Sequence, residues 1–344
     1  MIRGLMIGLQ PFHGRDILLV LRTFVVGPVG VGFMVGIREF VQSFDRRCRR
    51  VMAILLLAST GMAGCQSTEA DHRLRWDGDR DSYIFDVGEV QTVRGLGAGQ
   101  GVEVRDGFVY LYGDADTGVI REFRSRAHAD YRQRLTPTGR SIRLTRGGRD
   151  VIGHPTGLTF HPAFGTVLGN TVNGVGTIYF LDWEQALADG HLDRSILHVV
   201  KDDAAVNGTR PEFVEFDGRW YVATSDYGAS GNEIRLYDPT VLRRVNRTSE
   251  EGVLQHSWSC TPWVQNLYWH GSDKHLMLVQ NQIEGLRWRL TVLAMTPDGP
   301  EEMQVVDLDD YDDELEGFHL LSRDDALFYT SSREGNVVAA SVAR

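Results

Sequence analysis

Five short segments of similar pattern recur along the chain, at successive steps of 56, 56, 53 and 51 residues. They lie at residues 100–104, 156–160, 212–216, 265–269 and 316–320. Each is followed by short runs rich in β-branched and aromatic residues, with Gly, Asn and Asp between the runs. Four strands per unit of about fifty residues are typical of a β-propeller blade. The sequence therefore predicts an all-β fold, a five-bladed β-propeller; a β-sandwich with similar strand content would not predict this period.

The strand count also predicts how the ring closes. Second strands are expected at 108–112, 166–169, 220–224, 275–279 and 326–330, and third strands at 119–123, 177–181, 233–237, 289–294 and 336–342. Fourth strands are expected at 141–145, 196–200, 253–258 and 303–308, so the fifth unit lacks one. The β-rich run 83–87 precedes the first unit and can complete the last blade, which hides the edges of an open ring. Short helices are expected at 182–190 and 238–244, each after an N-cap Asp.

A second constraint is the segment 49–67, which has the pattern of a secretory signal although it begins about fifty residues into the chain. An arginine cluster precedes a short apolar run, and small residues then lead to Ala63-Gly64-Cys65. This ending resembles the lipobox of bacterial lipoproteins, with Met62 in place of the more usual Leu. The resemblance implies that Cys65 is lipidated and becomes the first mature residue. Gln66 favours the outer membrane, and a buried amphipathic segment with an incidental cysteine is the alternative.

The residues before this signal have two interpretations. Residues 17–37 are mostly apolar and could form a weak transmembrane segment. Alternatively, translation begins at Met34, which would leave an ordinary basic region ahead of the apolar run. We prefer Met34, and we expect a signal region over 1–64, a flexible tether over 65–81 and the propeller over 82–344.

Charge and cysteine content exclude several classes of function. From Cys65 onward the chain has 28 basic and 43 acidic residues, a formal net charge of about −15. Such a surface does not attract nucleic acid or anionic lipid headgroups, so membrane attachment would depend on the acyl chains. Cys260 would then remain alone, with no partner for an intramolecular disulfide.

The loops around one end of the propeller channel are the expected binding site. Loops that enter the first strands and loops that join the second and third strands open on the same face. Their polar and aromatic side chains predict a concave binding pocket for a ligand or a partner protein. The residues expected to bind are Gln100, Asn170, Arg210, Trp263, Gln265, Asn281 and Arg333. Trp263 is the expected aromatic contact, whereas Trp269 and Trp288 are expected to pack between blades.

Catalysis by channel carboxylates is the alternative function. Glu212, Glu316 and Asp226 could act as paired acids in glycoside cleavage, although the flanking motifs of arabinanase-type propellers are missing. His154 is a further catalytic candidate and could instead bind a divalent metal with His319 and Glu316; a structural histidine is the simpler interpretation. Cys260 with His256 is a conceivable nucleophilic pair, but both residues also fit a strand end.

Cofactor evidence is weak. The run 307–316 is dense in carboxylates and could attract calcium, but it lacks EF-hand spacing, and charge runs are usually solvated. Asp307, Asp309 and His319 are therefore the candidate metal ligands, and no cofactor other than calcium is expected. The sequence contains no G-x-S-x-G, H-E-x-x-H or phosphate-binding glycine loop.

Two resemblances accompany these patterns. Gln100-Gly101 and Glu316-Gly317 resemble the first-strand signature of bacterial and plant-type glutaminyl cyclases, which are five-bladed propellers. Residues 154–162 look like the blade openings of the gluconolactonase and YVTN-type propellers, in which acids and an Asn from different blades hold a metal. The likeness implies the fold and, more weakly, a hydrolase or cyclotransferase activity. The principal expectation is a lipid-anchored periplasmic or surface-exposed binding propeller.

Overall fold

The computed structural model describes residues 2–11, 17–26, 83–126, 134–283, 285, 287–308 and 313–343. The chain divides into two compact units, Met1–Ala70 and Asp71–Arg344. In the first unit, β1 (Ile2–Pro11) and β2 (Ile17–Val26) pair antiparallel, with Ile2 opposite Val26 and Pro11 opposite Ile17. The first part of the apolar run 17–37 is thus a strand rather than a helix. Among the described residues, no helix is both long and apolar enough to cross a membrane. The signal-like segment 49–67, including Cys65, lies outside the described residues.

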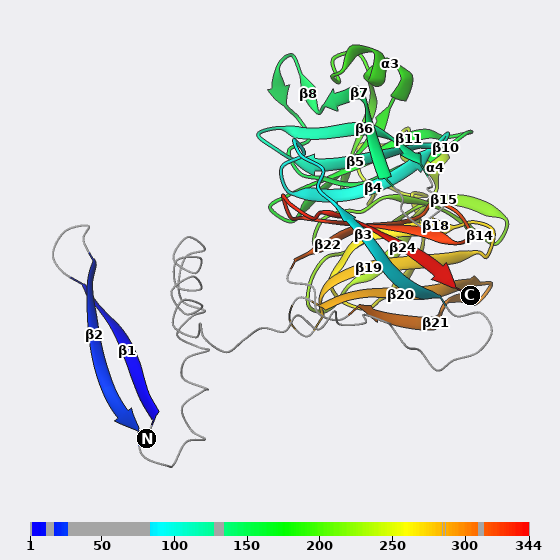
Figure 1. Cartoon of the computed structure of the whole chain (residues 1–344). Coiled ribbons are helices and arrows are strands. Elements are labelled where there is room, and N and C mark those ends of the chain that lie inside the picture. The colour runs from blue at the N-terminus through cyan, green and yellow to red at the C-terminus, as the bar shows by residue number, and fades with distance from the viewer. Residues whose placement is uncertain are drawn as a thin grey trace. The chain divides into compact units, whose positions relative to one another are not determined.

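The second unit contains five antiparallel four-stranded sheets, which are the blades of a propeller (Figure 1). Blade 1 consists of β4 (Gly99–Arg105), β5 (Phe108–Asp114), β6 (Gly118–Arg126) and β7 (Arg134–Arg143). Blade 2 consists of β10 (Pro155–His161), β11 (Gly165–Val172), β12 (Val175–Leu181) and β13 (Ile196–Asp202). Blade 3 consists of β14 (Glu212–Phe216), β15 (Arg219–Ser225), β16 (Glu233–Tyr237) and β17 (Leu254–Ser259). Blade 4 consists of β18 (Val264–His270), β19 (His275–Ile283), β20 (Arg287–Thr296) and β21 (Gly299–Leu308).

Blade 5 joins the two ends of the propeller. It contains β22 (Leu315–Leu320), β23 (Asp325–Thr330) and β24 (Val337–Ala343), and β3 (Ile84–Gln91) is its outer strand. Figure 1 shows β3 in cyan beside β24 in red. The ladder runs from Ala343 opposite Ile84 to Val337 opposite Gln91. The predicted closure by an N-terminal strand is therefore confirmed.

The outer strand of blade 1 differs from the prediction. It was expected at 141–145, but β7 begins at Arg134, and Thr145 belongs to a separate short pair, β8 (Thr145–Arg146) with β9 (Arg149–Asp150). Pro137 and Gly139 make this segment look like a loop in the sequence. A register shift between Arg121 and Phe123 allows β7 to pair with β6 on both sides of the irregular stretch.

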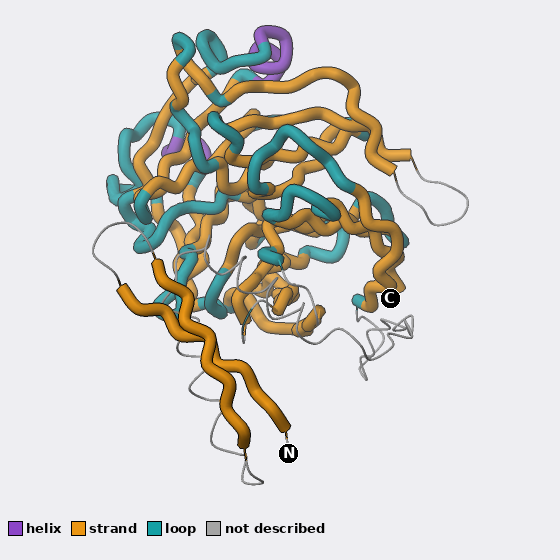
Figure 2. The backbone as a smooth tube through the Cα atoms, turned by 60° about the vertical axis from the view of Figure 1, so that its left-hand side comes forward, coloured by secondary structure: helices purple, strands orange, loops and turns teal. Residues whose placement is uncertain are grey.

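The two predicted helices are confirmed, and Figure 2 shows both as short purple segments. The helix α3 (Trp183–Asp189) begins after Asp182, whose side chain accepts from the Gln185 N–H, and ends at Gly190 in the left-handed region. The helix α4 (Pro239–Leu242) follows the N-cap Asp238.

Apolar side chains from facing blades form the core between the sheets. Adjacent residues on an inner strand point to opposite blade faces. On β14, Phe213 packs with blade 2 residues such as Phe180, and Val214 packs with blade 4 residues such as Leu267. Trp269 and Trp288, which are 9% and 1% exposed, belong to this core as expected.

Candidate functional site

The first strand of each blade, here called the inner strand, positions the channel side chains. Four of the five inner strands have a register shift near their start, at Gln100, at Thr156-Gly157, at Gln265 and at Glu316. The inner strand β14 has a regular ladder, in which Glu212 lies opposite Ala223. A Cβ on Gly157 would lie 2.7 Å from the Pro211 carbonyl oxygen, so Gly permits the close approach of the two strands. Glu212 lies beside Thr159 at this approach, and its hydrogen-bond partners therefore differ from those of Glu316.

At the end of the channel where the predicted loops lie, here called the loop-side mouth, Arg210 is the central side chain. It is 3% exposed, and its Nε donates to the Gln265 carbonyl oxygen at 3.1 Å. Its Nη1 donates to the Asn207 carbonyl oxygen at 3.4 Å, and its guanidinium lies 5.0 Å from the Tyr227 ring centroid. The Gln265 amide in turn donates to Glu316 Oε1 at 3.1 Å. Arg210, Gln265 and Glu316, all selected from the sequence, are thus parts of one network.

Tyr227 extends this network to the aromatic residue expected at the mouth. The Tyr227 and Trp263 rings meet edge to face, with centroids 5.2 Å apart. The Tyr227 hydroxyl donates to Asn281 Oδ1 at 3.4 Å and accepts from Gln282 Nε2 at 2.7 Å. The backbone of Trp263 has a φ of +62°, which is uncommon for a residue with a side chain. Such strained conformations cluster at functional sites.

Burial shifts the titration of both charged groups at the mouth. It lowers the pKa of Arg210 to about 10, a change that the negative charge of Glu316 opposes, so the guanidinium remains protonated at neutral pH. Burial raises the pKa of Glu316 well above its usual value, helped by the charge of Glu314 and opposed by Arg210. No ion pair within 4.0 Å joins Arg210 to Glu316 among the described residues, and the Gln265 amide lies between them.

The middle of the channel is closed by packed side chains. Asn266 Nδ2 donates to the Tyr112 hydroxyl at 2.7 Å and to the Glu316 carbonyl oxygen at 3.2 Å, and both side chains are buried. A Cβ on Gly101 would lie 2.0 Å from the Tyr112 hydroxyl oxygen, so glycine is required there by close approach. The loop-side mouth is thereby separated from the other end of the channel.

At that other end, near the turns between first and second strands, lies a cavity of about 370 Å³, here called the hairpin-side cavity. Each inner strand contributes at least one polar side chain to its lining, and β10 also contributes His161. The other side chains are Glu103, Thr159, Glu212, Tyr268 and His319. Aromatic residues complete the wall, including Phe160, Trp220 and Trp269. The sequence-based selection concentrated on the loops and missed Glu103, Thr159 and Tyr268, although all three occupy the fourth position of the aligned repeat.

Two carboxylates dominate the electrostatics of the hairpin-side cavity. Glu212 accepts from Thr159 Oγ1 at 2.8 Å and from the Phe213 N–H at 3.0 Å. Burial nevertheless raises its pKa to about 8. Burial, together with the charge of Glu212, raises the pKa of Glu103 well above its usual range. The Glu103–Glu212 pair is thus a like-charge pair in a poorly solvated site.

His319 contributes a neutral imidazole to the same cavity. Its Nδ1 lies 2.8 Å from the Leu320 carbonyl oxygen, which can only accept, so Nδ1 carries the proton. Burial lowers the pKa of His319 to about 4. At neutral pH, Nε2 is therefore a hydrogen-bond acceptor.

The four catalytic candidates do not gather at one place. Glu212 lines the hairpin-side cavity, whereas Glu316 belongs to the loop-side network. Asp226 is 1% exposed and accepts from both Nη atoms of Arg235 at 2.9 Å, so it orders its loop. His154 Nδ1 lies 3.3 Å from Asp114 Oδ2. These positions do not support catalysis by the four residues acting together.

The remaining predicted residues have varied surroundings. Asn170 is buried and accepts from the His154 N–H, while Gln100 is buried at its register shift and Arg333 is exposed. Asp307 accepts from Arg289 at 2.6 and 3.0 Å, and Asp309 lies outside the described residues. In the described part of the chain, no group of three or more His, Cys, Asp or Glu side chains is placed to hold a metal ion.

Cys260 is free, and burial raises its pKa to about 12. His256 stacks on Trp258, with ring centroids 5.3 Å apart, instead of pairing with the thiol. A raised thiol pKa disfavours the thiolate that nucleophilic catalysis needs.

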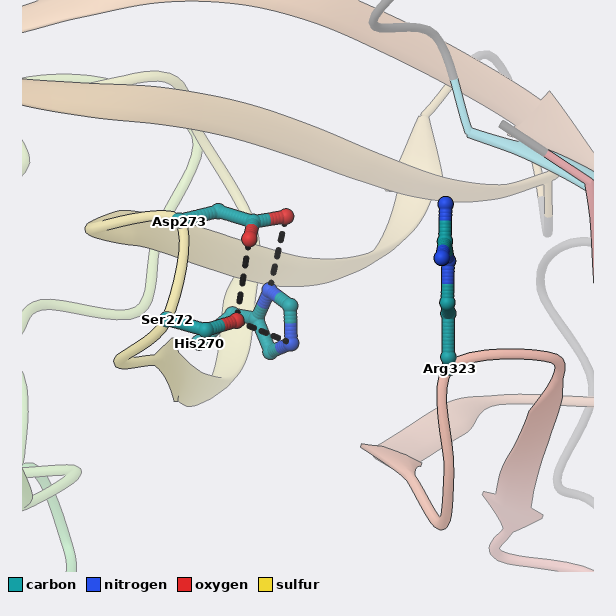
Figure 3. Close-up of a pocket in the computed structure, with 4 residues that line it drawn as sticks. All are labelled: His270, Ser272, Asp273 and Arg323. Atoms are coloured by element: carbon teal, nitrogen blue, oxygen red, sulfur yellow. Dashed lines mark hydrogen bonds and ion pairs between the residues drawn. The ribbon is translucent and has the colours of Figure 1, made fainter.

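A second cavity of about 390 Å³ lies at the turns of blades 4 and 5 (Figure 3). His270, Ser272 and Asp273 lie together on one side, and Arg323 faces them across the gap. His270 Nδ1 is 3.2 Å from Asp273 Oδ2, and Ser272 Oγ is 3.3 Å from His270 Nε2. However, the shorter contact of Ser272 Oγ, 2.9 Å, is donation to Asp273 Oδ1. A nucleophilic serine would instead direct its proton toward the histidine.

No family model matches this sequence, and no curated protein matches it. A search of solved structures finds similarity to Kuenenia stuttgartiensis hydrazine synthase, with 9% sequence identity and a TM-score of 0.37. The similar region covers 69% of this chain and 57% of that chain. The five four-stranded sheets by themselves define the class: a five-bladed β-propeller, a scaffold that commonly binds ligands or proteins.

Proposed function

We propose that the protein is a lipid-anchored propeller that binds a polar ligand or a segment of a partner protein at the loop-side mouth. The observation that carries this proposal is Arg210. Its side chain is only 3% exposed, and its Nε and Nη1 donate to backbone carbonyl oxygens. Nη2 forms no hydrogen bond among the described residues and is not fully buried, so it is accessible to an acceptor on a ligand.

The surroundings of Arg210 fit this role. Trp263 is half-buried and offers an aromatic surface, while Glu316 Oε2 is a second polar atom without a partner among the described residues. An acceptor on the ligand would bind Nη2, and its apolar part would pack on Trp263. These groups belong to separate loops of blades 3, 4 and 5, so the rigid ring sets their spacing.

The anchoring part of the proposal is supported by the sequence pattern ending at Cys65. The acidic mature chain would not bind anionic lipid by charge, so attachment would rest on acyl chains. A Cys65→Ser variant should move from the membrane fraction to the soluble fraction and lose incorporated radiolabelled palmitate. Continued membrane association of this variant would refute the lipid anchor.

Binding at the mouth is tested by tagged wild-type protein purified from bacterial membranes in mild detergent. Proteins and small molecules that co-purify are quantified by mass spectrometry. Trp263→Ala should lose the specific ligand or partner, while the control Gln255→Ala, outside the mouth, should retain it. Equal recovery with all three proteins would overturn the assignment of the mouth.

A further inference from the structure

The hairpin-side cavity has the construction of a second binding site, independent of the loop-side mouth. Its volume of about 370 Å³ is within the range of small-molecule sites. All five inner strands contribute to it, and inner strands are the most constrained part of a propeller. Asn266 and Tyr112 close the channel between this cavity and the mouth.

The two carboxylates of this cavity have no hydrogen bond or ion pair with a cation among the described residues, and the charge of Arg105 only partly offsets the raised pKa of Glu103. Among the described residues, no side chain donates a hydrogen bond to Glu103, and Glu212 receives only neutral donors. Arg105 is the nearby basic residue, but its guanidinium lies 3.7 Å from the Phe160 ring centroid. It also forms ion pairs of 3.3 Å with Asp106 and Glu184, which lie outside the cavity lining.

His319 adds a hydrogen-bond acceptor to the wall through Nε2. Tyr268 also lines the cavity, and its hydroxyl interacts with the Leu320 backbone. The Trp269 indole N–H has no partner among the described residues, but it is fully buried and does not border the cavity space. The polar contacts available to a bound molecule therefore come chiefly from Glu103, Glu212 and His319.

The aromatic wall favours an organic cation over a bare ion. Trp220, Tyr268 and Phe160 present ring surfaces that can contact a cation or the alkyl chain attached to it. An ammonium group has three donors, which match the acceptors on Glu103, Glu212 and His319. The described residues provide no group of three or more His, Cys, Asp or Glu side chains placed to hold a metal ion, so a divalent ion would find fewer ligands here than it prefers.

The geometry points to the hairpin-side cavity as a binding site for a protonated primary amine, held between Glu103 and Glu212 with its alkyl chain against the aromatic wall. An ammonium group favours the ionised carboxylates, so binding is expected to release a proton near neutral pH, where Glu212 is mostly protonated. Affinity should therefore increase between pH 6 and pH 9, as long as the amine itself stays charged.

The test is calorimetric titration of the full-length protein in detergent with n-butylamine hydrochloride. Saturable binding is expected, with proton release seen as a dependence of the heat on buffer ionisation. Glu103→Gln and Glu212→Gln should each weaken binding at least tenfold. Glu215→Gln is the matched control, because this residue is on the same strand as Glu212 but pairs with Lys274 at 3.8 Å outside the cavity.

Three further measurements test whether the cavity recognises the charged amino group. The uncharged n-butanol should not bind, calcium chloride should not compete with the amine, and Trp263→Ala at the loop-side mouth should leave amine affinity unchanged. Equal binding of n-butanol, displacement of the amine by calcium, or equal loss of affinity in Glu215→Gln would each overturn the proposal. The pH dependence of the wild-type affinity gives a result that needs no variant, and a flat profile would also contradict it.

Discussion

The two ends of the channel differ in how they accommodate buried charge. At the loop-side mouth, Arg210 and Glu316 are joined through Gln265, and Asp226 beneath them is neutralised by Arg235. At the hairpin-side cavity, Glu103 and Glu212 face each other with no cation hydrogen-bonded to either. The loop-side mouth therefore contains charges of both signs, while the hairpin-side cavity contains two carboxyl groups whose simultaneous ionisation is unfavourable until a cation binds. We expect substitutions to lower stability at the first end and to raise it at the second.

The largest effect is expected beneath the loop-side mouth. Asp226→Ala leaves Arg235, whose side chain is 3% exposed, without its bidentate partner and with only the partly exposed Glu233 as a counter-ion. Removing one member of a buried ion pair typically costs about 3–5 kcal/mol in unfolding free energy. Urea denaturation followed by tryptophan fluorescence measures this loss. A loss of unfolding free energy below about 1 kcal/mol would show that the Asp226–Arg235 ion pair contributes little to the stability of the loop-side mouth.

A smaller loss is expected at the closure between the two ends. Asn266→Ala removes the amide donor to the buried Tyr112 hydroxyl, which keeps its hydrogen bond with the Leu158 backbone. The expected cost in unfolding free energy is therefore about 0.5–1.5 kcal/mol by the same denaturation measurement. Adding Tyr112→Phe to the Asn266→Ala variant should lower the unfolding free energy only slightly further, because both substitutions remove the same hydrogen bond. Full additivity would contradict the direct interaction.

The hairpin-side cavity should respond in the opposite direction. Because the pKa of Glu212 is about 8 in the folded protein against the usual 4.5, the folded protein holds an extra proton between these pH values. Its contribution to stability therefore falls as pH rises from about 4.5 to 8. Glu212→Gln should flatten this profile and raise the unfolding free energy at pH 8 by at least about 1 kcal/mol, since one pKa unit corresponds to about 1.4 kcal/mol. Destabilisation at pH 8 would show that the pair is not repulsive.

The smallest effect is expected outside both ends. Glu215→Gln removes a 3.8 Å ion pair to Lys274, whose side chain is 61% exposed. Exposed pairs contribute little, so the unfolding free energy should change by less than about 0.5 kcal/mol at either pH. A larger change, or a change in the pH profile, would mean that the effects of Glu212→Gln do not arise in the hairpin-side cavity.

The repeat made most of the fold predictable from sequence. The spacing of residues 100, 156, 212, 265 and 316 fixed the number of blades, and the unassigned run before blade 1 predicted that β3 would join β24. The outer strand of blade 1 was misplaced because Pro137 and Gly139 interrupt its β pattern. Such irregular stretches depend on the register of a neighbouring strand, which the sequence does not display.

The site was predictable only in part. Arg210, Trp263, Gln265, Asn281 and Glu316 were selected as loop-side residues, and the structure joins them through Tyr227. Glu212 was grouped with them because it aligns with Glu316, but the regular ladder of β14 places it beside Thr159. The sequence does not display which inner strands contain a register shift, nor the close approach of Pro211 to Gly157 beside β14. Alignment of repeats therefore located the inner strands but not the side of the channel that each carboxylate faces.

The most direct test of the difference between the two ends is a titration of the glutamate side-chain carboxyls by NMR, with ¹³C at the δ carbon. The Glu212 resonance, assigned by its absence in Glu212→Gln, should titrate with a pKa of about 8. In Glu103→Gln the Glu212 resonance should keep most of its raised pKa, since burial is the largest cause. Titration of Glu212 near its ordinary value of 4.5 would contradict the account, because the cavity would then hold a solvated carboxylate and no charge for a cationic ligand to neutralise.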